Sequence, residues 1–210
     1  MATGFFITLE GGEGGGKSTQ AKLLGQALQR HGRAVTLTRE PGGSPGAEAI
    51  RALLVRGDAN RWDGLTEALL HYAARRDHVE CTVRPALAAG RVVISDRFAD
   101  STTAYQGYGH GLDLPAIASL HRLALGDFMP NLTFILDLTV EKGLLRAAQR
   151  GGNDNRYETM GRDFHERLRQ GFLAIAARDP ARCVVVDADR SVEDIHRDLW
   201  TVVDKRLRLS

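Results

Sequence analysis

The chain has 210 residues, a length that fits one α/β domain with a substantial core, and its composition of 43% hydrophobic and 26% charged residues is typical of a soluble globular protein. The formal net charge of +2 is too small to indicate a surface that binds nucleic acid or a membrane. The two cysteines have no neighbouring Cys or His that would indicate a disulfide framework or a zinc site, and the lack of a signal peptide or membrane span predicts a cytoplasmic protein.

Apolar runs of strand length alternate with helical patterns along the chain. The runs that we interpret as strands are Phe5 to Leu9, Ala34 to Leu37, Val92 to Ile94, Leu132 to Leu136 and Cys183 to Val186. Such nearly continuous apolar strands are typical of a parallel sheet that helices cover on both faces. The pattern therefore predicts an α/β fold: a three-layer, doubly wound, five-stranded parallel sheet.

Two of the segments between the strands have a clear apolar helical face. The first face carries Ala21, Leu24 and Leu28, and a longer, later one carries Leu65, Leu69, Tyr72 and Val79. Gly32 and Gly90 each lie between a helical pattern and the next strand, where a C-terminal helix cap is expected. We found no internal repeat and no linker composition, which predicts a single domain spanning residues 1–210.

A phosphate-binding motif follows the first strand and begins the first helix. Residues 11–18 match the pattern G-x-x-x-x-G-K-[ST] in full, which predicts that the doubly wound sheet is of the P-loop NTPase type. Glycines let successive backbone N–H groups surround phosphate oxygens, and the positive end of the helix adds to that attraction. Lys17 is expected to reach the β- and γ-phosphates of ATP, and the Ser18 hydroxyl to bind Mg²⁺. The predicted ATP-binding residues are Gly11, Gly12, Glu13, Gly14, Gly15, Gly16, Lys17, Ser18 and Thr19.

A second magnesium-organising carboxylate is expected at the end of a neighbouring strand. Asp96 ends the run that begins at Val92, and Arg97 follows it directly. Asp137, after another strand, is the competing position, and Asp96 is alternatively a helix N-cap. We predict that Ser18 and Asp96 bind Mg²⁺ and that Asp96 takes part in catalysis together with Lys17.

The phosphate-binding loop by itself does not separate kinases from nucleotide-driven switches or motors. A GTPase switch needs an Asn-Lys-x-Asp segment, which this chain lacks, and motor ATPases usually form part of a longer chain. A kinase for a small molecule needs a second pocket rich in arginine, and 24 of the 28 basic residues here are Arg. A kinase is therefore favoured, with a hydrolysis-driven switch as the alternative.

Four strings of the sequence resemble bacterial thymidylate kinases in order and spacing. They are EGGEGGGKST at residues 10–19, TREPGG at 38–43, SDRF at 95–98 and STTAYQG at 101–107. The similarity extends from about residue 4 to about residue 160. It implies transfer of the γ-phosphate of ATP, with Mg²⁺, to dTMP, by an enzyme that is usually a homodimer. Deoxycytidylate and uridylate are the alternative acceptors.

The resemblance also assigns residues to the acceptor phosphate and sugar. Arg39, Arg51 and Arg97 match the arginines that surround the monophosphate, a group that needs several fixed donors. Glu13 matches an acid that binds the sugar 3′-hydroxyl, and Tyr105 matches a ring that blocks a 2′-hydroxyl.

Further residues are assigned by the resemblance to the base of the acceptor. Ser101 with Tyr105, and Thr102 with Gln106, are i, i+4 pairs, and Thr102 matches a residue at the base edge. His71 and Arg75 match a pair that stacks on thymine and donates to its O4 atom. Because the family usually has Phe at the His71 position, Tyr72 is the alternative stacking ring. A stacked His71 is expected to titrate near pH 6.5.

Arginines also surround a glycine-rich polar stretch at residues 151–155. Arg146 and Arg150 are four residues apart, and Arg156 follows the stretch. One branch of the resembled family has a catalytic Arg in the phosphate-binding loop, but this chain has none there. We therefore expect a helical lid at about residues 146–159 whose Arg150 and Arg156 act on the transferred phosphate. The alternative is a solvated basic helix face.

Overall fold

The computed structural model describes residues 4–57, 61–150 and 156–209, with Arg150 described by its backbone alone. Five parallel strands form one sheet in the order β2 (Val35–Arg39), β3 (Val92–Asp96), β1 (Phe5–Glu10), β4 (Leu132–Asp137) and β5 (Cys183–Asp187). The predicted fold class and all five predicted strands are confirmed, each within a few residues of its expected ends.

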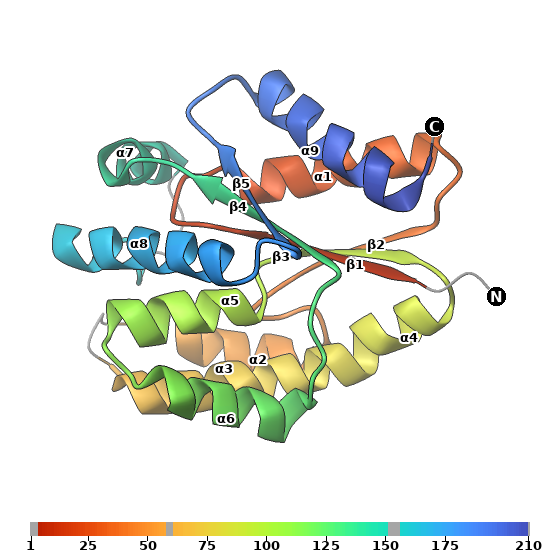
Figure 1. Ribbon diagram of the computed structural model, residues 1–210. Coiled ribbons are helices and arrows are strands. Elements are labelled where there is room, and N and C mark those ends of the chain that lie inside the picture. Colours follow the sequence, from red (N-terminus) through yellow and green to blue (C-terminus); the bar gives the residue numbers. More distant parts are fainter. Residues whose placement is uncertain (1–3, 58–60, 151–155, 210) are drawn as a thin grey trace.

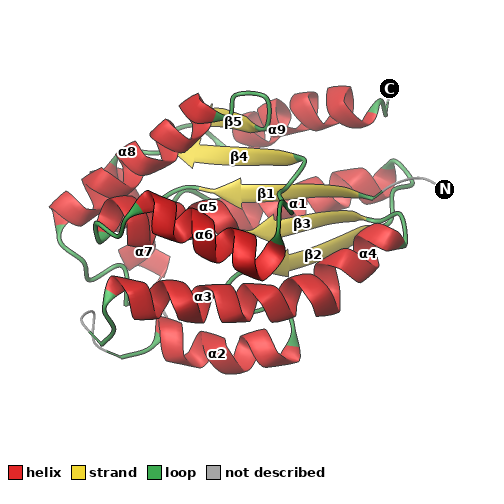
Figure 2. Ribbon diagram, turned by 60° about the horizontal axis from the view of Figure 1, so that its bottom comes forward, coloured by secondary structure: helices red, strands yellow, loops and turns green. Residues whose placement is uncertain are grey.

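Helices cover both faces of this sheet (Figure 1). One face carries α1 (Lys17–Arg30) and α9 (Val192–Leu207), which pack against each other. The opposite face carries α2 (Pro45–Val55), α3 (Gly64–His78), α4 (Arg84–Ala88), α5 (Ala99–Thr102), α6 (Leu114–Leu125) and α8 (Arg162–Arg178), as Figure 2 also shows. Two π-helical segments, η1 (Val79–Val83) and η2 (Thr103–Gly109), continue α3 and α5, and α7 (Val140–Arg150) follows β4.

Alternate side chains of each strand enter separate cores on the two faces of the sheet. Ile7 and Leu9 of β1 pack in the core with Leu24 of α1 and Leu199 of α9. Phe6, on the opposite face of the same strand, packs with the η1 valines and with Phe98. A third cluster joins α8 to β4 and β5. The three layers that the apolar strands predicted therefore come from burial on both faces of the sheet.

The apolar face predicted for the first helix is confirmed, but that of the longer helix is only partly correct. Tyr72 and Val79 are buried, whereas the side chains of Leu65 and Leu69 are 47% and 49% exposed. The buried face of α3 instead carries three polar residues, Glu67, Arg75 and His78. Their ion pairs allow this burial, which an apolar pattern does not indicate.

The two glycines predicted to cap helices have the backbone conformation that such caps need. Gly32 and Gly90 both have a φ of +73°, in the left-handed region expected for helix caps. The N-cap Asp63 begins α3 by accepting hydrogen bonds from the backbone N–H groups of Leu65 and Thr66.

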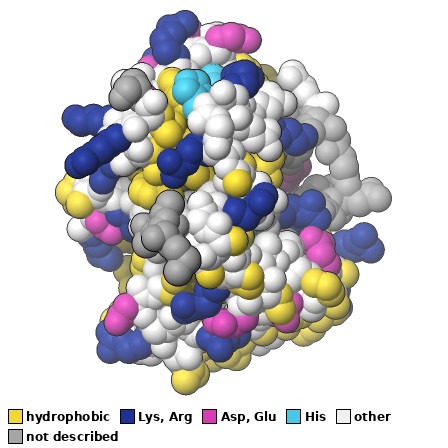
Figure 3. All heavy atoms as spheres, turned by 90° about the vertical axis from the view of Figure 1, so that its right-hand side faces the viewer, with side chains coloured by type: hydrophobic (Ala, Val, Ile, Leu, Met, Phe, Trp, Pro, Cys, Tyr) yellow, Lys and Arg dark blue, Asp and Glu magenta, His cyan; other side chains and the backbone are white. Residues whose placement is uncertain are grey.

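The surface away from the carboxyl ends of the strands has mixed charge. On the face that Figure 3 shows, basic and acidic side chains are interspersed among apolar ones, in keeping with the net charge of +2. Within the described ranges, none of the helices combines the length and the apolar character needed to cross a membrane.

Candidate active site

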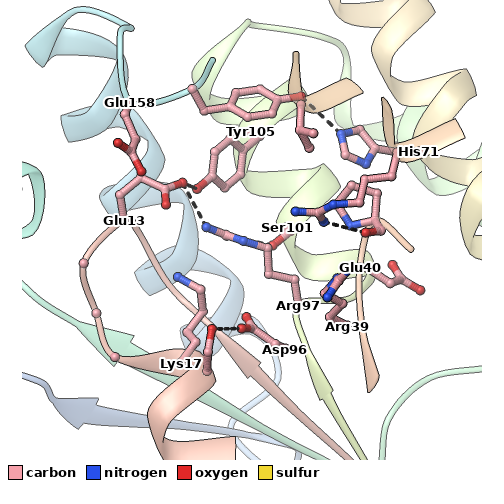
Figure 4. A pocket seen from close by; sticks show the side chains of 18 of the residues that line it. Glu13, Lys17, Arg39, Glu40, His71, Asp96, Arg97, Ser101, Tyr105 and Glu158 are labelled. Atoms are coloured by element: carbon pink, nitrogen blue, oxygen red, sulfur yellow. Dashed lines mark hydrogen bonds and ion pairs between the residues drawn. The ribbon is translucent and has the colours of Figure 1, made fainter. Parts of the chain in front are cut away.

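A cavity of about 550 Å³ lies at the carboxyl ends of the parallel strands, where ligands usually bind in this class of fold. Its walls come from the loop after β1, the ends of β2 and β3, and helices α2, α3, α5 and η2 (Figure 4). The predicted site residues that line it are Glu13, Gly14, Gly15, Gly16, Lys17, Ser18, Thr19, Arg39, Arg51, His71, Asp96, Arg97, Ser101, Tyr105 and Gln106.

The phosphate-binding loop has the backbone that its glycines predict. Gly11, Gly14 and Gly16 have φ values of 127°, 68° and 82°, which side-chain-bearing residues rarely adopt. A Cβ atom on Gly14 would lie 2.2 Å from the carbonyl oxygen of Gly143, so the loop also lacks room for a side chain there. These turns allow the loop N–H groups to face inward, ahead of the N-terminus of α1.

Lys17 lies at the start of α1 and folds back over the loop. Its Nζ donates hydrogen bonds to the carbonyl oxygens of Gly11 and Gly12, at 3.0 and 2.6 Å. Burial, with a smaller contribution from the nearby Arg97, lowers the pKa of Lys17 to about 8. An added negative charge in front of the loop would restore the stability of the charged ammonium.

Ser18 and Asp96 meet at the mouth of the loop. The Ser18 hydroxyl donates a short hydrogen bond to the Asp96 carboxylate. Asp96 is not the N-cap of α5, since Phe98 holds that position. The competing carboxylate, Asp137, instead accepts two hydrogen bonds from Arg169, at 2.7 and 2.8 Å, and does not line the cavity. A hydroxyl and a carboxylate side by side are hard oxygen donors of the kind that Mg²⁺ prefers.

Arg97 is held across the site by several contacts. Its guanidinium donates to a Glu13 carboxylate oxygen at 2.9 Å, to the Gly11 carbonyl at 3.1 Å and to Ser101 Oγ at 3.2 Å. It also lies over the ring of Tyr105, at 5.0 Å from the ring centroid. The φ of Arg97 is +72°, a strained value for a residue with a side chain and one that often marks functional sites.

A buried acid supports Arg97 from behind. The Glu10 carboxyl group accepts from the backbone N–H of Phe98 at 2.7 Å and from the Ser101 hydroxyl at 2.5 Å. Burial, followed by the charge of Asp100, raises the pKa of Glu10 to about 8. Ser101 thus links Glu10 to Arg97.

Two further arginines reach the same cavity from other elements. Arg39, at the end of β2, pairs with Glu48 at 3.1 Å, and its side chain is 55% exposed. Arg51, on α2, donates to the carbonyl oxygen of Pro41 at 2.7 Å. Three cationic side chains from three different elements therefore line one cavity.

Arg75 lies just behind the cavity wall and is fully buried. Its Nε contacts Glu40 at 2.7 Å, and its Nη2 donates to the Phe98 carbonyl and to Thr102 Oγ1, both at 3.1 Å. Its Nη1 has no hydrogen-bond partner among the described residues. Thr102 likewise does not line the cavity, and in this structure it accepts from Arg75.

His71 lines the cavity, whereas Tyr72 does not. Tyr72 packs instead against Arg75 and edge-on against His121. The His71 Nε2 lies 3.2 Å from the Tyr157 hydroxyl, and burial, followed by the charges of Arg75 and Arg97, lowers the pKa of His71 to about 3. The expected titration near pH 6.5 is therefore wrong, because burial among cations keeps the ring neutral.

Gln106 lies on η2 beside the cavity. Its amide nitrogen donates to Glu67 at 2.9 Å, and its amide oxygen is buried with no hydrogen-bond partner among the described residues. The π-helical turn displaces residues from ideal helical spacing, which is frequent at functional sites.

Comparisons with known proteins agree with this geometry. The sequence profile of the family described as thymidylate kinase matches residues 9–199. The chain is 56% identical to thymidylate kinase of Caulobacter vibrioides, over 100% of both chains, and 49% identical to that of Ruegeria pomeroyi, over 96% of this chain and 95% of the relative. A crystal structure of thymidylate kinase from Ehrlichia chaffeensis superposes with a TM-score of 0.77 at 36% identity, covering 96% of this chain and 99% of that one.

The chain belongs to the thymidylate kinase family. The resemblance inferred from the four strings is confirmed, and the nucleotide-driven switch is no longer a competing interpretation. Members of this family are ATP-dependent nucleoside monophosphate kinases, so the enzyme class expected from the sequence is confirmed as well.

In this member of the thymidylate kinase family, the lid role expected of Arg156 does not fit the position of its side chain. That side chain is 1% exposed, forms an ion pair with buried Glu67 and donates to the Leu54 carbonyl at 3.2 Å. It does not line the cavity. The Arg150 side chain and residues 151–155 lie outside the described residues. Arg146 does line the cavity, with Nη1 donating to the Ala188 carbonyl at 2.9 Å.

Sequence reasoning missed several residues of this site. Glu40, Tyr157 and Glu158 line the cavity, and Glu67 lies directly behind it. Glu40 stands within the string TREPGG, where an acid between cationic and glycine residues was a usable signal. Glu67 stands in an ordinary helical segment and gave no such signal.

Proposed function

We propose that this chain transfers the γ-phosphate of ATP to dTMP, giving ADP and dTDP for the synthesis of deoxythymidine nucleotides. Its membership of the thymidylate kinase family supports this reaction. The observation that carries the assignment of the site is the convergence of Glu13, Arg97 and Tyr105 beside the phosphate-binding loop (Figure 4). This cluster joins the donor side of the cavity to the acceptor side.

On the donor side, the loop from Gly11 to Thr19 would hold the ATP phosphates. Phosphoryl transfer depends mainly on positioning and on stabilising the charge of the transferring oxygens. Lys17, whose ammonium is already held against the loop carbonyls, would bind that charge. We propose that Ser18 and Asp96 hold Mg²⁺, either directly or through its waters. When bound, the ion would neutralise charge between the phosphates.

On the acceptor side, Arg39, Arg51 and Arg97 would hold the dTMP phosphate. Three cations fixed by Glu48, the Pro41 carbonyl and Glu13 give a dianion several donors at once. We propose that the Glu13 carboxylate accepts from the sugar 3′-hydroxyl.

Beyond the phosphate, Tyr105 would restrict the sugar. Its ring is fixed edge-on by Tyr157, Phe164 and Phe172, with centroids 5.1, 6.2 and 6.3 Å away. A ring that is held this firmly would occupy the space of a 2′-hydroxyl and favour deoxyribose. Ser101 would act by holding Arg97 in place.

Two buried atoms that have no hydrogen-bond partner among the described residues support a thymine site. Arg75 Nη1 is a donor and Gln106 Oε1 is an acceptor, and the edge of thymine presents an acceptor at O4 and a donor at N3–H. Cytosine presents the opposite pattern at both positions, so this pair would disfavour deoxycytidylate. His71, neutral and facing the cavity, would stack on the base, and Thr102 would fix Arg75.

We retain residues 1–210 as one kinase domain with a lid at about residues 146–159. Arg146 lines the cavity from α7, and Arg150 ends the same helix. We propose that Arg150 supplies the lid cation. Arg156 would reach a phosphate only by leaving its buried carboxylate, and we assign it to the His71 end of the site.

We further propose a homodimer formed through α3 and α6. These two helices pack together, and they carry the exposed side chains of Leu65, Leu69 and Leu123, the last of which is 85% exposed. Apolar side chains of this size on adjacent helices favour a protein partner. Because ATP and dTMP are metabolites of the cytoplasm, we propose that location for the enzyme.

The proposed function is tested by coupled ADP release with dTMP, dUMP, dCMP and UMP, each compared with a reaction without acceptor. We expect turnover with dTMP to exceed that with dCMP and UMP strongly, and turnover without acceptor to be negligible. ADP release that does not depend on an acceptor, or a preference for dCMP, would overturn the assignment.

A further inference from the structure

A buried carboxylate outside the cavity contacts several side chains around the end of the cavity that is assigned to the base. Glu67, on α3, is 0% exposed. One of its oxygens pairs with Arg156, 89 residues later in the chain. The other accepts from Gln106 Nε2 at 2.9 Å and from the Tyr157 hydroxyl at 3.3 Å, and lies 3.5 Å from His110 Nε2. Both oxygens are therefore engaged as acceptors.

These contacts determine which way the Gln106 amide points. A carboxylate oxygen repels an amide oxygen and accepts from an amide nitrogen, so the nitrogen must face Glu67. The amide oxygen then lies on the other side. It is buried in a residue that lines the cavity, and no group in the described part of the chain donates to it. An unpartnered buried acceptor is costly unless a ligand donates to it.

We propose that Glu67 is a positioning residue for base selection, because it fixes the Gln106 amide with its oxygen toward the acceptor base. This proposal rests on the proposed function, in which Gln106 accepts from N3–H of a thymine-type base. Glu67 itself does not touch the base. It makes the site an acceptor at that position, and a base with a ring acceptor there, such as cytosine, is disfavoured.

The same carboxylate sets the hydrogen on the stacking ring. The Tyr157 hydroxyl has one proton, which it donates to Glu67, so it can only accept from His71 Nε2. His71 therefore carries a proton on Nε2, and its ring, which is neutral because burial lowers its pKa to about 3, is held by Tyr157. Glu67 thus orders two base-contacting side chains from one buried position.

A carboxylate is required because both of its oxygens accept. In a Glu67→Gln variant, only one oxygen remains, and the charged Arg156 competes for it most strongly. The new amide NH₂ group then faces Gln106 Nε2, and two donors cannot bond. Gln106 is expected to rotate, so that its oxygen accepts from residue 67 and its NH₂ group faces the base.

The test is the ratio of kcat/KM for dTMP to kcat/KM for dCMP in Glu67→Gln. We expect the ratio to fall about tenfold to a hundredfold, mainly through a higher KM for dTMP, with the KM for ATP unchanged. Because both acceptors are measured on one preparation, a lower folded fraction does not change the ratio. An unchanged ratio would overturn the proposal.

A double variant covers the case in which the single one fails to fold. Glu67→Leu with Arg156→Leu removes both charges of the buried pair, which is less destabilising than removing one. It leaves Gln106 Nε2 without the acceptor that fixes the amide, and the ratio should fall as in the single variant. A wild-type ratio in this folded protein would contradict the proposal.

Three further variants separate positioning from other effects. Arg182→Gln breaks a different buried ion pair, with Asp100 at 2.6 Å, and should leave the ratio unchanged. Glu67→Gln with Gln106→Glu restores an acceptor facing the base and should restore the ratio. Gln106→Leu should lower the ratio. If Gln106→Leu keeps the wild-type ratio, the base-reading role in the proposed function fails. If Gln106→Leu lowers the ratio but Glu67→Gln does not, the positioning role of Glu67 is refuted while the proposed function stands.

Discussion

The phenol of Tyr105 donates a 2.6 Å hydrogen bond to the carboxylate of Glu13, which stands within the phosphate-binding loop. The same carboxylate oxygen accepts from Arg97 at 2.9 Å. Burial raises the pKa of Tyr105 well above its ordinary value, so the phenol remains a donor. One atom therefore links the loop after β1, the end of β3 and the π-helical segment η2. Movement of any of these elements would alter both halves of the site.

Replacing Lys17 with Ala should lower kcat about a hundredfold or more, because the lost charge acts on the transferring phosphate. The fold should be retained, since the hydrogen bonds of the removed ammonium within the described residues go to carbonyls of the loop itself. Steady-state kinetics with circular dichroism measures both properties. Lys22→Ala, an exposed lysine of the same helix, is the matched control. Near-normal kcat in folded Lys17→Ala would refute the assignment of the loop.

Replacing Tyr105 with Ala should weaken discrimination against ribose, because the ring would no longer fill the space of a 2′-hydroxyl. The measurement is the ratio of kcat/KM for the deoxy acceptor to that for the ribo acceptor. Tyr105→Phe keeps the ring and removes the bond to Glu13. It should retain the ratio while raising the KM of both acceptors. Equal ratios in all three proteins would place sugar selection elsewhere.

His71 should remain neutral during catalysis between pH 5.5 and 7.5, because its pKa is lowered to about 3. The KM for dTMP in wild type and in His71→Phe should then change with pH in parallel, following the phosphate of the acceptor, whose second pKa is near 6. A wild-type profile with an additional transition near pH 6.5, absent from the variant, would show that the ring does titrate.

The lowered pKa of His71 also predicts a pH dependence of stability. The unfolded chain binds a proton on this ring below about pH 6.5, whereas the folded chain does not bind it until about pH 3. The free energy of unfolding should therefore fall as the pH drops below about 6.5, by at most about 1.4 kcal/mol per pH unit from this group. Urea unfolding at pH 5 and 7 should show a smaller pH effect in His71→Phe than in wild type.

Arg150→Ala and Arg156→Ala should have different effects. Arg150→Ala should lower kcat more than it raises the KM for ATP, because a lid cation binds most tightly in the transition state. Arg156→Ala should instead lower the free energy of unfolding by about 3–5 kcal/mol, because it leaves the buried Glu67 carboxylate without its cation. Kinetics and urea unfolding of both variants test this difference, which would be refuted if Arg156→Ala lost kcat without losing stability.

Leu65→Glu with Leu69→Glu should convert a dimer into a monomer, because the charges would lie in the proposed apolar interface on α3. Sedimentation velocity measures the outcome. Val192→Glu, at a side chain that is 43% exposed on the opposite side of the sheet, should leave the oligomeric state unchanged. A monomeric wild type, or a double variant that stays dimeric, would exclude this interface.

Features encoded by short segments were predictable from the sequence. The five strands follow from local runs of apolar residues, and the phosphate-binding loop from glycines that permit its backbone. The convergence of Asp96 and Arg97 on that loop also follows from local information, because parallel strands end at one edge of the sheet. The assignment of the family needed only four short strings and their spacing.

The placement of charged side chains depended on the tertiary structure. Arg156 pairs with Glu67, 89 residues earlier in the chain, and Arg75 pairs with Glu40, 35 residues earlier. A single charged residue in a sequence is normally predicted to be exposed to solvent. The cost of burying its charge is offset only by a partner that lies far away in the sequence. Because these partners are available, Glu67 and Arg75 lie on the buried face of α3. Leu65 and Leu69 lie on its exposed face. The sequence by itself therefore determined the fold, the loop and the family, while long-range ion pairs decided which arginines line the cavity and which are buried behind it.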